Sequence, residues 1–94
     1  MFRHFLFLLA AFVIASTAPA QEESAQARYA DAKDAFDKGD FQGARKMAEK
    51  MLSQGQLSRE AFQLLGNAHY RLGHLGEASL FFRRANYSPP LSQR

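Results

Sequence analysis

Apolar side chains recur at helical spacing along most of the chain and predict four short helices. In the first, residues 25–38, the positions Ala25, Tyr29, Ala32 and Phe36 share one face. The later helices show similar stripes: Ala44, Met47, Ala48, Met51 and Leu52; then Ala61, Phe62, Leu65, Ala68, His69 and Leu72; then Ala78, Phe81, Phe82 and Ala85. The pattern therefore predicts an all-α fold of antiparallel helix-turn-helix hairpins.

Capping and breaking residues stand where each predicted helix begins or ends. Ser24 and Ser58 precede the first and third stripes and can accept a hydrogen bond from a free amide of the first turn. The glycines that follow the first three stripes, Gly39, Gly55 and Gly73, are expected to end those helices. The two prolines at positions 89–90 forbid continuation of the fourth.

The segment 1–20 differs from the rest of the chain and predicts a signal peptide. Arg3 and His4 form a basic head, residues 5–15 carry no polar side chain, and Ala18-Pro19-Ala20 has the small-x-small pattern of a cleavage site. The apolar run is short for a helix that crosses about 30 Å of hydrocarbon. We expect cleavage after Ala20 and a periplasmic or secreted protein; the alternative is an uncleaved anchor that leaves the protein on the membrane, facing the periplasm.

Composition narrows the function of the remaining domain, residues 21–94. Removal of Arg3 leaves 11 basic against 9 acidic side chains, which is too balanced a charge to argue for nucleic acid. Cysteine is absent, so thiol chemistry, thiolate metal sites and disulfides are excluded. A domain this small has only a marginal core of its own.

An internal repeat organises the domain. The segment KGDFQGA at residues 38–44 reappears as LGHLGEA at residues 72–78, so that the spacing from Gly39 to Gly73 equals the spacing from Ala44 to Ala78. This spacing is the period of about 34 residues that is typical of units with two helices each. The sequence therefore indicates two repeats, about 25–58 and 59–92.

The second repeat resembles the tetratricopeptide-repeat family. It has the aromatic, Leu-Gly, small and closing proline positions of the family pattern, at Phe62, Leu65, Gly66, Tyr70, Gly73, Ala78, Phe82, Ala85 and Pro90. The first repeat keeps Gly39, Phe41 and Ala44, but Asp31 and Ala32 replace Leu-Gly and Gln56 replaces the proline. The resemblance covers about residues 25–90. It implies a short solenoid in which Gly66 and Ala78 let helices cross closely, while the first helix is a divergent end cap.

A narrower similarity concerns the run LGNAHYRLG at residues 65–73 together with the export signal. This combination is similar to the exported repeat subunits of bacterial aerotolerance (BatE-like) operons. The resemblance implies a scaffold that holds a protein partner, as a peptide or helix of an envelope protein, and no enzymatic activity.

In this family the first helix of each hairpin lines a concave binding surface. The outward residues of those helices would be Gln26, Tyr29, Lys33, Phe36, Gln63, Asn67, Tyr70 and Arg71. Of these, the candidate partner-binding residues are Tyr29, Lys33, Gln63, Asn67, Tyr70 and Arg71. Lys33, Asn67 and Arg71 together could hold a carboxylate, although the two cations also fit an ordinary solvated face.

Other polar clusters have plain structural interpretations. His69 and His74 do not share a helical face, so we expect no metal site, with His69 packed at the edge of the core and His74 in a solvent-exposed turn. The acidic ridge of Asp31, Asp34, Asp37 and Asp40 is interpreted as a solvated face with an Asp34–Lys38 pair. No catalytic constellation, cofactor motif or wide basic stripe is present in the sequence.

The last helix leaves one face without a neighbour. Leu80, Phe81 and Tyr87 are expected to form an apolar edge, because neither a third repeat nor a polar capping helix follows. An alternative function follows from this edge: the chain is a fragment of a longer scaffold that self-associates as a homo-oligomer through its last helix.

Overall fold

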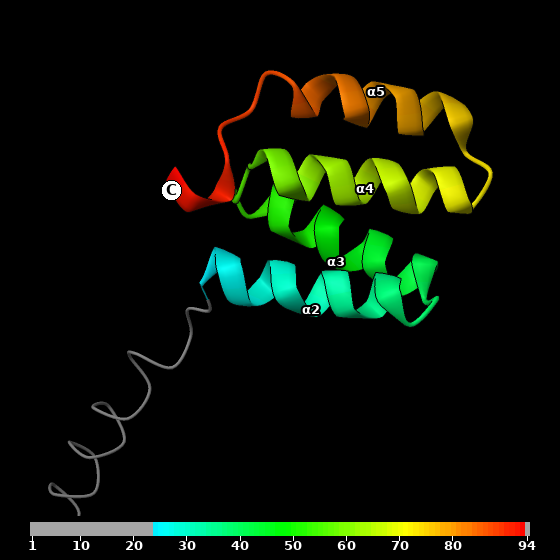
Figure 1. Ribbon diagram of the computed structural model, residues 1–94, viewed down its shortest axis with the longest axis horizontal. Coiled ribbons are helices and arrows are strands. Elements are labelled where there is room, and N and C mark those ends of the chain that lie inside the picture. The colour runs from blue at the N-terminus through cyan, green and yellow to red at the C-terminus, as the bar shows by residue number, and fades with distance from the viewer. Residues whose placement is uncertain (1–23, 94) are drawn as a thin grey trace, which may run out of the picture.

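The computed structural model describes residues 24–93, which form four α-helices and one short 3-10 helix (Figure 1). The helices are α2 (Ala25–Asp37), α3 (Phe41–Ser53), α4 (Arg59–Arg71) and α5 (Leu75–Ala85), followed by η2 (Leu91–Gln93). Residues 24–93 contain no strand, in agreement with the predicted all-α class. The predicted signal peptide, residues 1–20, lies outside the described residues. None of the helices within residues 24–93 is long and apolar enough to cross a bilayer.

Side-chain caps begin three of these helices. The hydroxyl oxygens of Ser24 and Ser58 accept hydrogen bonds of 3.1 Å from the amides of Ala27 and Ala61, which confirms both predicted caps. Asp40 caps α3 in the same way, with a distance of 2.9 Å from its Oδ1 to the amide of Gly43. Each cap satisfies one of the amides that a first turn leaves without an intrahelical partner.

Glycines in the left-handed conformation end the first three helices. Gly39, Gly55 and Gly73 have φ values of 87°, 79° and 85°, a region that residues with a Cβ rarely enter. Each lies next to the C-cap of its helix, as a left-handed helix end requires. The predicted stop signals are therefore confirmed at all three positions.

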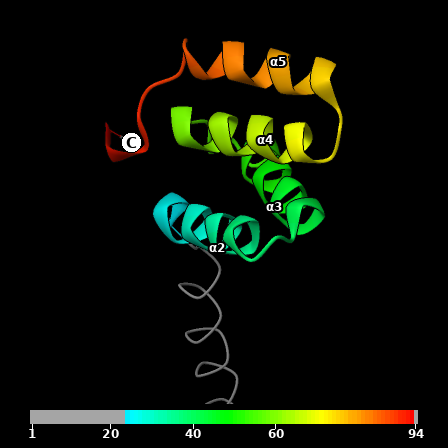
Figure 2. The same ribbon diagram turned by 45° about the vertical axis from the view of Figure 1, so that its right-hand side comes forward.

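Each helix packs against the next one along the chain, and α2 also contacts α4 (Figures 1 and 2). Mostly small side chains fill the space between the helices. Ala32, Ala44, Ala48, Ala61, Leu65 and Ala68 are completely buried, and Met51 is 1% exposed. Because alanine adds little bulk at a helix crossing, the helix axes can approach closely and the small chain gains a dense core.

Positions one sequence repeat apart share the same local structure. Asp40 and His74 precede α3 and α5 with φ, ψ values of −86°, 75° and −90°, 75°. The glycines before them have nearly equal φ values, and Ala44 and Ala78 are 0% and 2% exposed. Within the described part of the chain, backbone angles and burial at these positions therefore repeat with the period of the sequence.

The crossing of α4 and α5 depends on Gly66. A Cβ added at Gly66 would lie 2.8 Å from two carbons of the Phe82 ring, so the ring rests on bare backbone. Phe81 follows its place in the apolar stripe and not the expected exposed edge: its ring stacks on Phe62 and His69, with centroid distances of 6.3 and 5.4 Å. The helical period turns Phe81 toward α4 and leaves Leu80 outward. Leu80 is 40% exposed, and Tyr87 beyond the helix is 87% exposed.

The chain turns back after α5 and returns to the first turn of α4. The amide of Arg59 donates to the carbonyl of Pro89 at 2.9 Å, and the amide of Leu91 donates to Oε1 of Glu60 at 2.7 Å. Leu91 is only 7% exposed. We call residues 89–93 the return segment. It satisfies a free amide of α4 and buries one further leucine.

Candidate functional site

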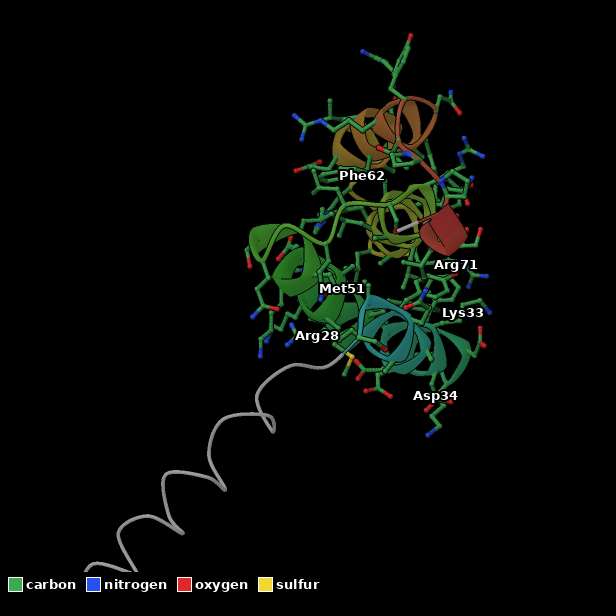
Figure 3. All side chains as sticks on the ribbon, turned by 90° about the vertical axis from the view of Figure 1, so that its left-hand side faces the viewer. Arg28, Lys33, Asp34, Met51, Phe62 and Arg71 are labelled. Carbon is green, nitrogen blue, oxygen red and sulfur yellow. The ribbon has the colours of Figure 1, made fainter. Side chains whose placement is uncertain are left out.

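The helices α2 and α4 form one side of the molecule, away from α3 (Figure 3). We call this side the α2–α4 face; it carries the six predicted partner-binding residues, Tyr29, Lys33, Gln63, Asn67, Tyr70 and Arg71. On α4, Gln63, Asn67, Tyr70 and Arg71 are all exposed, and Tyr70 keeps 59% of its surface. On α2, Lys33 is exposed and Tyr29 is half-buried. Lys33 and Arg71 point to this same side in Figure 3.

Lys33 is already engaged by a carboxylate of its own helix. Its Nζ lies 3.0 Å from both Oδ1 and Oδ2 of Asp37, and this hydrogen bonding raises the pKa of the lysine. The two side chains are 49% and 56% exposed. An ion pair so open to water contributes little stability, so an incoming carboxylate exchanges with Asp37 at low cost.

Arg71 is held by aromatic rings rather than by an acid. Its guanidinium carbon lies 5.1 Å from the centroid of Phe41 and 5.7 Å from that of Phe36. The two rings meet edge to face at 5.1 Å. Stacking on a ring face orients the planar guanidinium while its N–H groups remain able to hold a carboxylate. The sequence suggested a cation here but not this stacking, which joins α2, α3 and α4.

The other end of the α2–α4 face is shaped by the return segment. Figure 3 shows η2 on the side of α4 opposite α3, the side where Lys33 and Arg71 are labelled. Glu60 binds the amide of Leu91 and also acts electrostatically on Tyr29. Burial is the main cause that raises the pKa of Tyr29. Sequence reasoning missed this cluster, because only the folded chain brings Leu91 to Glu60.

The histidines also meet in a way that the sequence did not predict. Nδ1 of His69 lies 3.0 Å from Nδ1 of His74, because the left-handed turn at Gly73 folds the chain back, with the His74 amide 2.8 Å from the His69 carbonyl. His69 is 6% exposed, as expected for the edge of the core, and Oε2 of Glu49 lies 3.9 Å from its Nε2. Burial lowers the pKa of His69, and the neighbouring His74 lowers it further. His74 is exposed but bonded to its neighbour.

The surface of α2 beyond the α2–α4 face carries acidic side chains and, next to α3, a small open cavity. Asp34 pairs with Lys38 at 2.9 Å, as predicted, and points away from the rest of the molecule in Figure 3. Groups of three or more potential metal ligands do not occur within residues 24–93. An open cavity of about 170 Å³ between α2 and α3 is lined by Arg28, Asp31, Met47, Lys50 and Met51. It is smaller than the pockets that hold cofactors or drug-sized ligands.

The α2–α4 face gathers polar, charged and aromatic side chains from two helices. It combines two cations whose partners leave them accessible, two amides and two phenol rings, all on the helices α2 and α4. In comparisons with known proteins, no family model, curated protein or solved structure matches this chain.

Proposed function

We propose that this chain is an exported, tetratricopeptide-like module that binds a peptide or helix of an envelope protein on its α2–α4 face. The sequence period, about 34 residues long, and its counterpart in the local backbone support a repeat of two hairpins. The export signal predicted in residues 1–20 supports a partner in the cell envelope. The proposed role is binding and not catalysis.

The return segment is the observation that carries this proposal. The α2–α4 side already holds a short stretch of polypeptide through its main chain: the Arg59 amide donates to the Pro89 carbonyl, and the Leu91 amide donates to the Glu60 carboxylate, with Leu91 buried. A surface that captures a segment in this way has the groups that peptide recognition uses: main-chain partners for affinity and a recess for an anchoring side chain.

The exposed part of the face, toward Lys33 and Arg71, favours an acidic segment. Arg71 is oriented by Phe36 and Phe41, and Lys33 is released from Asp37 at low cost. Asn67 and Gln63 lie one helical turn apart on α4 and both offer amide donors and acceptors. A carboxylate that reached this end would therefore receive charge-assisted hydrogen bonds.

Site-specific crosslinking in the native envelope tests the proposal. The full chain carries a photo-reactive residue at the exposed position Asn67, and crosslinked products are identified by mass spectrometry. We expect a discrete partner whose yield falls at least about fivefold in the Lys33→Glu, Arg71→Glu double variant, which corresponds to about 1 kcal/mol. Lys46→Glu, an exposed charge reversal on α3, is the matched control and should leave the yield unchanged. Equal yields from all three chains would refute the proposed face.

A further inference from the structure

The packing of α3 against α4 shows how one hairpin receives the next. At this interface the ring of Phe41 lies under the guanidinium of Arg71, and Glu49 faces His69 at 3.9 Å. Between these contacts, Ala44 of α3 and Ala68 of α4 belong to one buried cluster and are both completely buried. The side of α3 that contacts the following helix therefore carries an aromatic residue, a small residue and a charged residue.

One sequence repeat later, the residues equivalent to this side of α3 lie on α5. Phe41, Ala44 and Glu49 correspond to Leu75, Ala78 and Arg83. The residues that precede the two helices have the same backbone conformation, so the correspondence extends to the local structure. We call the side of α5 with Leu75, Ser79, Phe82 and Arg83 the α5 outer face. Leu75 is 62% exposed, and Phe82, whose ring rests on Gly66 of α4, keeps 36% of its surface exposed. In Figure 1 no element of the described chain packs on the side of α5 away from α4.

The charge on the α5 outer face indicates what would cover it. Arg83 stands where α3 has Glu49, and no ion pair joins it to another residue of the described chain. If a partner helix packed on α5 in the way that α4 packs on α3, the residue of that helix equivalent to His69 would lie opposite Arg83. Because Arg83 is a cation, a carboxylate is favoured at that place.

A second copy of this chain fits the α5 outer face poorly. One repeat before α4 stands α2. If the α2 of a second copy packed on α5 as α4 packs on α3, Asp31 and Asp34 would occupy the positions of the fully buried Leu65 and Ala68. Burying unpaired carboxylates against an apolar surface is costly. Two α5 helices packed in parallel through this face would bring Arg83 of each copy into one interface, where like charges repel.

We propose that the α5 outer face is a second docking surface, for an amphipathic helix of a partner protein. That helix has an apolar side that rests on Leu75 and Phe82, and a carboxylate that reaches Arg83. The surface is separate from the α2–α4 face and does not depend on the function proposed for it. Leu75 and Phe82 supply the apolar contact, and Arg83 sets the register and the charge of the partner.

A helical peptide based on α4 tests this docking surface. The probe has the sequence of residues 58–72 with His69→Glu, and a staple across the exposed positions 63 and 67 keeps it helical. Titration into the isotope-labelled full chain is followed by NMR. We expect the largest amide shifts within residues 75–86. Arg83→Glu should weaken binding about fivefold, the upper range for an exposed ion pair, and a probe with His69→Lys should restore it.

Matched variants decide between this surface and its competitors. Arg84→Glu makes the same charge change one position away and should alter the affinity less than about twofold, whereas Leu75→Ser should weaken it without unfolding the chain, because Leu75 is exposed. Shifts confined to α2 and α4, or equal affinities for Arg83→Glu and the unaltered chain, would overturn the proposal. So would sedimentation of the unliganded chain as a dimer that Leu75→Ser dissociates, since the occupant would then be a second copy.

Discussion

Gly66 of α4 lies directly beneath the ring of Phe82 of α5, so close that a Cβ on Gly66 would stand 2.8 Å from two ring carbons. This contact sets the distance between the two helices of the second hairpin. Gly66→Ala should therefore destabilise the fold by about 1–3 kcal/mol, because the ring or the helix must shift. Chemical denaturation followed by circular dichroism measures the change.

Gly76→Ala is the matched control for that substitution. Gly76 is also helical, but a Cβ at this position would meet open space. Alanine should stabilise the chain by about 0.5–1 kcal/mol here, because it restricts the unfolded state. Equal effects of the two substitutions would show that the close crossing has no energetic role.

Gly39 and Gly73 should respond alike to substitution. Their φ values are 87° and 85°, and a Cβ at either position would contact no other atom. The free-energy cost of alanine there therefore comes from backbone strain alone. Gly39→Ala and Gly73→Ala should each cost about 1–2 kcal/mol. Asparagine, which tolerates this conformation better, should cost less at both sites. Thermal denaturation of the four variants tests the equivalence; a cost at one site only would contradict it.

Ser24 and Ser58 make the same cap in different surroundings. Both accept an amide hydrogen bond of 3.1 Å, but Ser58 is completely buried and Ser24 is exposed. Ser24→Ala should cost about 0.5–1 kcal/mol, since water replaces the hydroxyl. Ser58→Ala should cost about 1–3 kcal/mol, because the amide of Ala61 is left buried without a partner. Urea denaturation measures both, and a larger effect at Ser24 would contradict the burial argument.

His69 should make stability depend on pH. Burial lowers its pKa in the folded chain, with a further contribution from His74 and Arg45, while Glu49 and Glu77 act in the opposite direction. The unfolded chain therefore takes up a proton first, near pH 6.5, so the contribution of His69 is present above that pH and is lost as the pH falls through the folded pKa.

Substitution of His69 by phenylalanine checks the sign of this dependence. The ring of residue 69 stacks on Phe81, a contact that phenylalanine can keep. Urea denaturation between about pH 7.5 and 5, the range in which histidine titrates, should show stability falling more steeply for the unaltered chain than for His69→Phe. A steeper fall in the variant would reverse the assigned direction of the shift.

Helix boundaries were predictable because their causes are local. Ser58 lies next to the amides that it caps, and Gly73 takes a left-handed φ where a helix must end and turn. The spacing of alanines and aromatics then indicated which helix faces are buried. The first helix, predicted over residues 25–38, accordingly spans Ala25–Asp37, and α3 and α4 end two residues before the glycines expected to stop them.

Contacts that join distant parts of the chain were not predictable. Glu60 and Leu91 are 31 residues apart, and nothing in either residue's neighbourhood indicates the other. Two prolines predict that α5 stops, but not where the chain goes next. Likewise, the apolar stripe placed Phe81 inward while the edge expectation placed it outward, and only the rotation of α5 about its axis decides that it stacks on His69.

The return segment has a practical consequence for anyone who labels this molecule. Because Leu91 is fastened to Glu60 beside α2, any polypeptide that continues past Gln93 starts at the edge of the face proposed for binding. An affinity tag or a fluorescent fusion attached there would crowd that entrance and hide a genuine interaction. A reporter placed in the exposed turn at Gln54 and Gly55, between α3 and α4, would leave it clear.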